Sequence, residues 1–550
     1  MTDTTSSDDG LDIPSPDGAV NTIDTDYEVG QDNIQPKFGP LTFDIHNPVF
    51  LISSLTTVAF VLVTLIFQDQ ASAVFNWLFT FVTTTFDGVF LMAANVFVLF
   101  CLFLIVSPWG KVRLGGTDAK PDFGYLSWFA MLFAAGMGIG LMFFGVLEPV
   151  YHMQVSGPLG LEGPLNEDGS VNQDLVQAAR AGGLAATIFH WGLHPWAIYA
   201  VVALALALFT YNKQLPLSIR SAFYPLMGDR VWGWPGHIID IIAVFATLFG
   251  LTTSLGLGAQ QASSGLHYVF GLPDGLNTQI IVIIGVTSVA LISVVRGIDG
   301  GVKLLSNINM CFAFILLMFV FLAGPTLQIL SDFWLGLSNY VMDVVPLSNP
   351  FGREDDSFRE GWTSFYWAWW ISWSPFVGMF IARVSRGRTV REFITCVMLI
   401  PTLVSVFWMA TFGGTAITQV LAMGSESGVY ENVIGSYNDS IAMFAMFGDM
   451  PLTMITSSLG IILVLVFFIT SSDSGSLVID TITAGGKTEA PTAQRVFWAT
   501  TEGIVAIVLL IGGGLTALQA MVNATGIIFT FVLLFLCWAT LQGLRSEPRG

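Results

Sequence analysis

Long apolar runs, separated by short polar segments, fill the chain from residue 48 almost to its end. Each run has the length that an α-helix needs to cross a hydrocarbon core of about 30 Å, and the runs lack the alternation typical of membrane β-strands. The pattern predicts an all-α integral membrane protein with twelve transmembrane helices. The predicted spans are 48–68, 84–107, 123–151, 177–210, 235–268, 277–296, 304–332, 360–384, 391–421, 452–480, 494–513 and 518–543.

The composition agrees with a membrane protein. Hydrophobic residues make up 53% of the chain and charged residues only 11%, against about 25% charged residues in a soluble domain. The first 40 residues are acidic and contain no apolar stretch, so we expect a disordered tail rather than a signal peptide. The net charge of −19 gives no support to nucleic-acid binding.

The basic residues predict the orientation of the spans. Placing the N-terminus inside puts seventeen of the twenty Lys and Arg residues on the cytoplasmic side and leaves Arg180, Arg353 and Arg359 outside. This excess predicts a multi-pass protein of the cell (inner) membrane with both termini in the cytoplasm. The loop Arg383–Arg391 holds four of these arginines. It is either a simple anchor of this kind or a surface for anionic lipid or acidic cytoplasmic tails.

Two spans contain residues that interrupt helices. The third span holds AAGMGIGLMFFG at 134–145, with four glycines, and the eighth holds Ser-Trp-Ser-Pro at 372–375. Clustered glycines weaken a helix and proline removes a backbone donor, although helix–helix packing also favours small residues. Spans three and eight each open a set of five. Matching breaks in two halves indicate an inverted-repeat transporter with its site at the membrane midplane.

This organisation divides the chain into six parts. They are a cytoplasmic tail (1–40), two peripheral helices (41–120), a first five-helix repeat (121–333), an extracellular connecting segment (334–359), a second five-helix inverted repeat (360–543) and a short cytoplasmic C-terminus (544–550). An ion channel fits less well, because a pore predicts repeated carbonyl or charged rings. An enzyme would need a nucleophile–base pair or a metal cluster, which the sequence does not suggest.

The stretch SFYWAWWISWSPF (364–376) carries seven aromatic rings. On an ideal helix, six of them fall within one arc of about 140°, and only Trp367 points away. Span four offers a second such face with Trp191, Trp196 and Tyr199. Two aromatic faces could enclose a quaternary ammonium ion, which is attracted to the negative faces of the rings. An interfacial belt and plain packing are the alternatives that the residues leave open.

Other candidate groups are better explained by structural roles. His190 and His194 have the i, i+4 spacing of metal ligands, but no carboxylate or cysteine accompanies them, so packing or polar contacts are the better explanation. The four cysteines lie far apart and predict neither a disulfide nor a metal site. Glu148 and Asp473 lie within spans, and we rank both as structural hydrogen-bond acceptors.

Four segments together resemble the betaine/choline/carnitine transporter family. They are FYWAWWISWSPFVGMFIARVSRGRTVREF, GMGIG, FHWGLHPWAIYA and TSSDSGS, of which the first is highly specific. The resemblance implies a LeuT-like fold of two helices followed by a five-plus-five inverted repeat with broken helices three and eight, usually assembled as a homotrimer. It also implies a secondary transporter, not an enzyme, with Na⁺ as the coupling ion and no organic cofactor.

The resemblance implies a substrate site between spans four and eight, where rings surround a trimethylammonium group and the glycine segment meets a carboxylate with its amides. Choline-preferring relatives often carry Asp where this chain has Gly140, which favours a zwitterion such as glycine betaine. Ectoine, carnitine, choline and a sulfonium such as dimethylsulfoniopropionate are the alternatives. The implied substrate-binding residues are Trp191, Trp196, Tyr199, Phe365, Trp369, Trp370, Trp373, Met137, Gly138, Ile139 and Gly140.

The resemblance also implies up to two sodium sites. The first would use Ala134, Met137, Phe467, Thr470 and Ser471. Hydroxyl back-bonding within the helix is the alternative role for the last two. The second would pair the hydroxyls of Thr247 and Ser254 with the ring of Phe376. Leu251 stands where sodium-coupled relatives carry Thr, which puts this second site in doubt unless Thr252 or Thr253 compensates.

Overall fold

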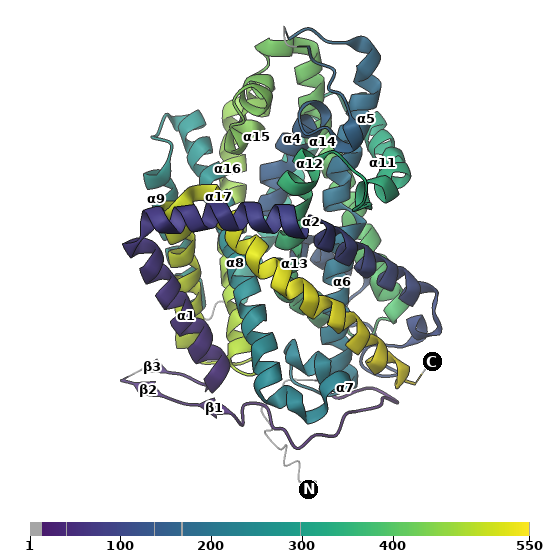
Figure 1. Ribbon diagram of the computed structural model, residues 1–550, viewed down its shortest axis with the longest axis vertical. Helices are drawn as coiled ribbons and strands as arrows, with labels where there is room; N and C mark the ends of the chain where they lie inside the picture. The colour runs from purple at the N-terminus through teal and green to yellow at the C-terminus, as the bar shows by residue number, and fades with distance from the viewer. Residues whose placement is uncertain (1–13, 40, 137, 167–168, 297–298, 549–550) are drawn as a thin grey trace.

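The computed structural model describes residues 14–39, 41–136, 138–166, 169–296 and 299–548. They form an elongated bundle of helices, which α2 crosses in the view of Figure 1. The longer helices are α1 (Asn47–Ile66), α2 (Gln68–Val106), α3 (Tyr125–Gly136), α4 (Ile139–Gln154), α5 (Gln173–Trp191), α6 (Leu193–Ala207), α8 (Trp234–Phe270), α9 (Leu276–Arg296), α10 (Asp299–Ala323), α11 (Thr326–Ser348), α13 (Ser364–Arg383), α14 (Val390–Met423), α16 (Thr453–Thr483) and α17 (Thr492–Arg545). The shorter ones are η1 (Pro108–Lys111), η2 (Pro158–Gly160), η3 (Leu208–Asn212), η4 (Arg220–Phe223), α7 (Tyr224–Met227), η5 (Gly228–Trp232), α12 (Asp356–Phe358), η6 (Arg359–Thr363), η7 (Gly424–Glu426), η8 (Tyr430–Gly435), η9 (Asp439–Ile441) and α15 (Ala442–Gly448).

Nine helical segments in the described part of the chain are long and apolar enough to cross a membrane. The structure is therefore that of an all-α integral membrane protein, as the apolar runs predict. One of the nine is α17, which Gly513 and Gly514 kink between the last two predicted spans. The third and eighth predicted spans are helical but are not among the nine. The number of twelve transmembrane helices therefore stays a prediction.

The two predicted helix breaks have different outcomes. The third span is broken: α3 ends at Gly136, α4 begins at Ile139, and Gly138 between them has a φ of −165° and a ψ of −133°. The eighth span differs from the prediction, because α13 continues through Pro375. Proline cannot donate to the carbonyl of Ile371, but the Ser374 hydroxyl donates to that oxygen over 2.6 Å. A side chain thus replaces the missing backbone bond, and the helix continues.

A further break, which the sequence did not predict, divides span four at Gly192 between α5 and α6. A Cβ atom at this position would lie 2.6 Å from the carbonyl oxygen of Ile188, so only glycine fits. The N–H of Leu193 is released from the helix by the break and donates to the Tyr340 hydroxyl over 3.1 Å. The break changes the helical phase of α6 relative to α5, and with it the set of side chains that share a face.

The connection between the two predicted repeats also differs from the prediction. The seventh span was expected to reach residue 332, with a connecting segment over 334–359; instead α10 ends at Ala323, and α11 is a separate helix. Arg180 of α5 forms a buried ion pair with Asp332 of α11, with a 2.5 Å contact. Together with the bond from Leu193 to Tyr340, this pair fastens α11 to both parts of the broken fourth span, α5 and α6.

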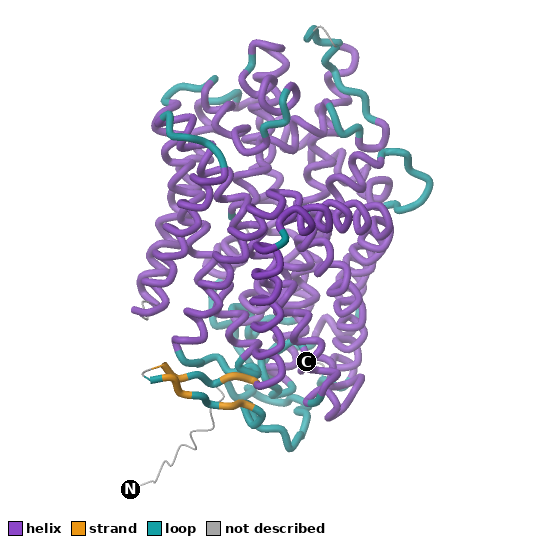
Figure 2. The backbone as a smooth tube through the Cα atoms, turned by 60° about the vertical axis from the view of Figure 1, so that its left-hand side comes forward, coloured by secondary structure: helices purple, strands orange, loops and turns teal. Residues whose placement is uncertain are grey.

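The N-terminal segment lies against one end of the bundle. Strand β1 (Asn33–Ile34) pairs with β4 (Ile45–His46), and β2 (Lys37–Phe38) pairs with β3 (Leu41–Thr42); Figure 2 shows these strands below the helices. Tyr27 stacks on Trp232 with ring centroids 4.2 Å apart. The prediction of a disordered tail is therefore wrong for residues 14–39, because buried aromatic and charged contacts hold them; residues 1–13 lie outside the described residues.

The arginine loop is one of the partners of this segment. Arg386 forms an ion pair with Asp17 over 2.8 Å. Of the alternatives considered for the loop Arg383–Arg391, contact with an acidic tail is thus present within the chain itself. Contact with anionic lipid stays a prediction.

Candidate binding site

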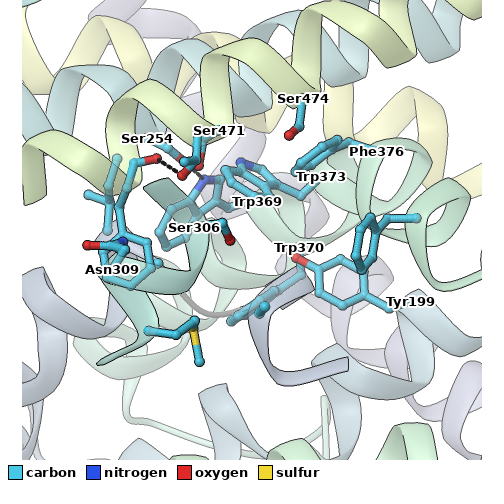
Figure 3. Close-up of a pocket in the computed structure, with 18 of the residues that line it drawn as sticks. Tyr199, Ser254, Ser306, Asn309, Trp369, Trp370, Trp373, Phe376, Ser471 and Ser474 are labelled. Carbon is cyan, nitrogen blue, oxygen red and sulfur yellow. Dashed lines mark hydrogen bonds between the residues drawn. The ribbon is translucent and has the colours of Figure 1, made fainter. Parts of the chain in front are cut away.

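A cavity of about 130 Å³ lies inside the bundle, beside the break in the third span (Figure 3). Its walls combine aromatic rings with hydroxyl groups from α8, α10 and α16. The residues that line it are Ala134, Gly138, Ile139, Gly140, Trp191, Tyr199, Ser254, Ser306, Asn309, Met310, Trp369, Trp370, Trp373, Phe376, Phe380, Phe467, Thr470, Ser471 and Ser474.

Five of these residues form what we call the aromatic cage: Trp191, Tyr199, Trp369, Trp370 and Trp373. Trp370 is central to it. Its ring lies nearly perpendicular to that of Trp191, at 5.1 Å and 87°, and to that of Tyr199, at 5.4 Å and 74°. Rings set at right angles around one space form a corner lined by π-systems, which suits a cation that has no N–H donors.

The indole N–H groups of the cage are all used in hydrogen bonds within the protein. Trp369 donates to the Ser254 hydroxyl over 3.1 Å, and Trp373 donates to the carbonyl of Gly250 over 2.8 Å. Trp370 donates to the carbonyl of His190 over 3.0 Å. The fourth, from Trp191, goes to the carboxylate of Glu148 over 2.8 Å. These bonds fix the orientation of each ring, so the polar edges are occupied while the ring faces remain available.

The glycine segment supplies the polar part of the cavity. Helix α4 begins at Ile139, and the first N–H groups of a helix have no partner within it, so they suit an anion such as a carboxylate. A Cβ atom on Gly140 would lie 2.7 Å from the ring of Trp191 and 2.9 Å from that of Trp369. Position 140 therefore has no room for a side chain.

More aromatic rings pack behind the wall of the cavity. Phe144 lies 5.3 Å from Tyr366 and 6.1 Å from Trp362, and Phe365 stacks on Trp369 at 5.5 Å. On the other side, Phe380 lines the cavity near the end of α13, close in sequence to the arginine loop that contacts the N-terminal segment. The cavity therefore extends toward the end of the bundle where that segment lies.

Not every predicted substrate-binding residue lines this cavity. Trp196 is buried behind Tyr199, with ring centroids 5.6 Å apart, so the three rings of span four do not share the single face that the sequence predicted. Phe365 lies behind Trp369 rather than at the cavity wall. Met137 lies outside the described residues. The remaining eight are brought together: Trp191, Tyr199, Trp369, Trp370, Trp373, Gly138, Ile139 and Gly140.

The sequence analysis missed five residues of the lining: Ser306, Asn309, Met310, Phe380 and Ser474. Ser306 and Asn309 lie three positions apart on α10, so they share one face of this helix. The polar stretch SNIN (306–309) at the start of the apolar run 310–323 is a signal that could have found them. Phe380 and Ser474 have no comparable signal in the sequence.

The four described residues of the first predicted sodium site also line the cavity: Ala134, Phe467, Thr470 and Ser471. The Thr470 hydroxyl donates to the carbonyls of Val466 and Phe467 over 3.0 and 3.1 Å. This is the back-bonding expected of a membrane helix, and it leaves the oxygen lone pairs free to accept or to bind a cation.

The second predicted sodium site is less complete. Ser254 and Phe376 line the cavity, but Thr247 does not, and its hydroxyl donates to the carbonyl of Ala243 over 2.8 Å. Neither neighbouring hydroxyl reaches the cavity in place of Leu251, because Thr252 and Thr253 do not line it. Thr252 donates to the carbonyl of Phe249, and Thr253 donates to those of Phe249 and Leu518. The described part of this site thus offers one hydroxyl and one ring at the cavity.

The two histidines of span four have separate partners. The Nδ1 atom of His190 lies 2.5 Å from a Glu148 oxygen, whereas the Nε2 atom of His194 lies 3.1 Å from the Asn95 side chain. Each histidine thus makes a polar contact, and the two do not share a partner. The sequence missed the carboxylate, because Glu148 precedes His190 by 42 positions and the fold brings them together.

The sequence as a whole matches known transporters. The model of the betaine/carnitine/choline transporter family matches residues 48–549. A glycine betaine/proline/choline transporter of Vibrio parahaemolyticus is 56% identical over 99% of this chain and 98% of its own. The glycine betaine transporter 1 of the same organism is 58% identical over 95% of this chain and 97% of its own. The glycine betaine transporter OpuD of Bacillus subtilis is 42% identical over 91% and 95%.

Solved structures give a weaker likeness. The manganese transporter of Eremococcus coleocola superimposes on 77% of this chain and 81% of its own at 15% identity, with a TM-score of 0.39, which is too low to bear on the fold. The family match and the relatives carry the assignment. The chain belongs to the betaine/carnitine/choline transporter family, and it is a multi-pass membrane transporter of small solutes, not an enzyme.

Proposed function

We propose that the protein imports glycine betaine by sodium symport. The observation that carries this proposal is the perpendicular arrangement of Trp191, Tyr199 and Trp370 around one cavity. A trimethylammonium group has a diffuse positive charge and no N–H donors, so it is inexpensive to desolvate. Each ring face contributes about 0.5–2 kcal/mol to its binding.

The other end of the cavity supports a zwitterion rather than a simple cation. The free N–H groups at the start of α4 suit a carboxylate. The lack of space at Gly140 excludes a carboxylate side chain that would balance a solute of net positive charge. Relatives that are 58% and 42% identical are both named glycine betaine transporters, which agrees with this choice.

The proposed coupling ion is Na⁺, bound and transported as a second substrate. Hydroxyl and carbonyl oxygens are the ligands that hard cations prefer. Thr470 and Ser471 present hydroxyls at the cavity, beside the broken third span. A second ion is not part of the proposal, because Leu251 offers no oxygen and Thr247, Thr252 and Thr253 do not line the cavity.

The proposed mechanism is alternating access in the inner membrane, with both termini in the cytoplasm. We assign the arrangement described to a state closed to the outside. The support is that rings around Phe144 pack behind one wall of the cavity, while Phe380 lines the cavity near the arginine loop that contacts the N-terminal segment. Assembly as a homotrimer stays a prediction from the family resemblance.

Uptake into liposomes tests the proposal. Purified protein is reconstituted, and radiolabelled glycine betaine is offered with an inward Na⁺ gradient or with K⁺ in place of Na⁺. We expect accumulation only with Na⁺. Equal accumulation in K⁺ would remove the sodium assignment and leave the solute assignment standing. No accumulation in either condition would overturn the choice of glycine betaine.

A broader substrate range is the second candidate. The relative that is 56% identical over nearly the whole chain is named for proline and choline as well as glycine betaine. The same liposomes, with unlabelled proline and choline as competitors, would measure this range. Because position 140 has no room for an acidic side chain, we expect weaker competition from choline than from glycine betaine.

A further inference from the structure

Glu148 lies where α4, α5 and α13 meet, and its side chain is fully buried. One carboxylate oxygen contacts His190 Nδ1 at 2.5 Å and His152 Nε2 at 3.1 Å. The other oxygen accepts hydrogen bonds from Trp191 Nε1 at 2.8 Å and from the Tyr366 hydroxyl at 2.5 Å. A carboxylate has about four acceptor positions, so all of them are filled.

The four partners indicate whether this carboxyl group is protonated or ionised. An indole N–H can only donate, and each histidine can present an N–H toward Glu148 while its other ring nitrogen contacts a hydroxyl. The Nε2 atom of His190 lies 2.9 Å from Thr363 Oγ1, and the Nδ1 atom of His152 lies 2.6 Å from Ser156 Oγ. A group surrounded by donors is satisfied as the anion, because a protonated carboxyl would need an acceptor.

A metal ion is a poorer explanation of the same cluster. The ligand atoms of Glu148, His152 and His190 lie within 4.8 Å of one another. However, the two nitrogen–oxygen contacts of 2.5 and 3.1 Å are hydrogen-bond distances. An ion with bonds of about 2.0–2.2 Å to each ligand would have to separate them.

The anion is connected to the aromatic cage through one ring. Trp369, Trp370 and Trp373 donate their indole N–H groups to a hydroxyl or to backbone carbonyls, all of them neutral acceptors. Trp191 alone in the cage donates to a carboxylate. A charged acceptor polarises the indole and makes its face more negative, and in a buried site the field of the charge is weakly screened.

We propose that Glu148 is the fixed counter-charge of the site. It acts through Trp191 to select solutes with a positive head group over solutes of the same shape whose head group is neutral. It is a positioning residue, since Trp191 lines the cavity and Glu148 does not. The proposal rests on the proposed binding of a quaternary ammonium solute. It goes beyond a structural acceptor, because a mechanical anchor for Trp191 would favour charged and neutral heads equally.

The test compares glycine betaine with 3,3-dimethylbutanoate, in which carbon replaces the charged nitrogen. Competition against radiolabelled glycine betaine on the purified protein gives both affinities. In Glu148→Gln we expect glycine betaine to bind about tenfold more weakly and the carbon analogue to change less than about twofold. The matched control is Tyr366→Phe, which removes one bond to the same carboxylate and keeps its charge. It should leave the ratio of the two affinities within about twofold of the original.

Several outcomes would overturn the proposal. Equal weakening of both ligands in Glu148→Gln would mean a mechanical anchor, and unchanged affinity for glycine betaine would mean no role. The carbon analogue could fail to bind both the unaltered protein and Glu148→Gln. In that case the proposal is overturned if Glu148→Gln loses no more glycine betaine affinity than Tyr366→Phe does. Failure of the unaltered protein to bind glycine betaine would instead overturn the proposed function.

A second pair of variants covers the case in which Glu148→Gln does not fold. Trp191→Phe and Trp370→Phe each replace a cage indole by a benzene ring, but only the first disconnects the cage from the carboxylate. We expect Trp191→Phe to reduce the preference for the charged head about threefold more than Trp370→Phe does. An equal reduction in the two variants would overturn the proposal.

Discussion

The α-carbon of Gly140 faces the ring of Trp191 so closely that a Cβ atom on the glycine would lie 2.7 Å from Cη2 of the indole. The ring cannot move away freely, because its N–H is bonded to Glu148 and its neighbour Trp370 stands at right angles to it. The size of the residue at position 140 therefore sets the position of a cage wall.

Gly140→Ala should weaken glycine betaine binding about tenfold, because the methyl group pushes on two fixed rings. Gly138→Ala is the matched control. A Cβ atom there would meet Phe467 at 3.6 Å, an ordinary contact, so we expect a change of less than about threefold. Equilibrium binding of radiolabelled glycine betaine measures both. Equal effects would show that loss of backbone freedom, rather than the clash, is responsible.

Trp370→Leu should abolish saturable uptake and leave the amount of protein in the membrane unchanged. The substitution removes the ring that faces both Trp191 and Tyr199. It also removes the hydrogen bond to His190. Trp370→Phe keeps a π-face and should retain measurable uptake with a raised KM. Uptake into liposomes at several solute concentrations checks this, and a near-normal KM in Trp370→Leu would contradict the central place of this ring.

The double variant Thr470→Val/Ser471→Ala should raise the Na⁺ concentration for half-maximal uptake about tenfold or more, because it removes both hydroxyls from the proposed ion site. Thr252→Val is the control. It removes a buried hydroxyl from the same kind of helix, but that hydroxyl donates to Phe249 away from the cavity. Uptake measured over a series of Na⁺ concentrations separates the two. A sodium dependence equally altered in both would argue against the assignment.

The contacts that His46 makes beside the N-terminal segment should stabilise the folded protein less as the pH falls. Burial, the adjacent Arg220 guanidinium and His237 lower the pKa of His46 to about 3, below its ordinary value of 6.5. Arg220 Nη1 contacts His46 Nε2 at 3.1 Å, which requires the neutral imidazole. Below pH 6.5 the unfolded chain binds a proton that the folded chain does not. Folding stability should therefore fall by up to about 1.4 kcal/mol per pH unit below that value.

Thermal unfolding of the purified protein between pH 7 and pH 5 measures this loss. His46→Gln keeps an acceptor for Arg220 and cannot titrate, so its Tm should depend less on pH than that of the unaltered protein. The same pH dependence in both proteins would assign the loss to other groups.

The parts of the site that could be predicted from sequence are those carried by one continuous helix. On α13, helical spacing alone placed Trp369, Trp370 and Trp373 together, and the structure brings them to one cavity. The same reasoning failed for Trp196, which packs behind Tyr199 of the same helix. It also missed the break at Gly192, because a periodic pattern presumes an unbroken axis and a single glycine followed by proline three positions later is a weak signal against it.

Contacts between distant segments account for the rest. Glu148 and Tyr366 are 218 positions apart and share a hydrogen bond, which helical periodicity cannot reveal. Pro375 was expected to break α13, but whether a proline breaks a helix depends on where the neighbouring hydroxyl points, here onto Ile371. The acidity of the tail and its lack of an apolar stretch predict disorder, because neither property reveals a distant partner. The basic and aromatic partners that hold it come from loops far along the chain.

Those partners come from both of the predicted repeats. The carbonyl of Asn21 accepts from Lys213 in the first, while Asp17 and Asp44 pair with Arg386 and Lys487 in the second. One short segment of the chain thus contacts both predicted repeats. In the alternating access proposed above, a movement that separates the repeats at this end of the bundle must either break one of these contacts or carry the segment along with one repeat. A fluorophore on this segment would therefore report that movement without occupying the cavity.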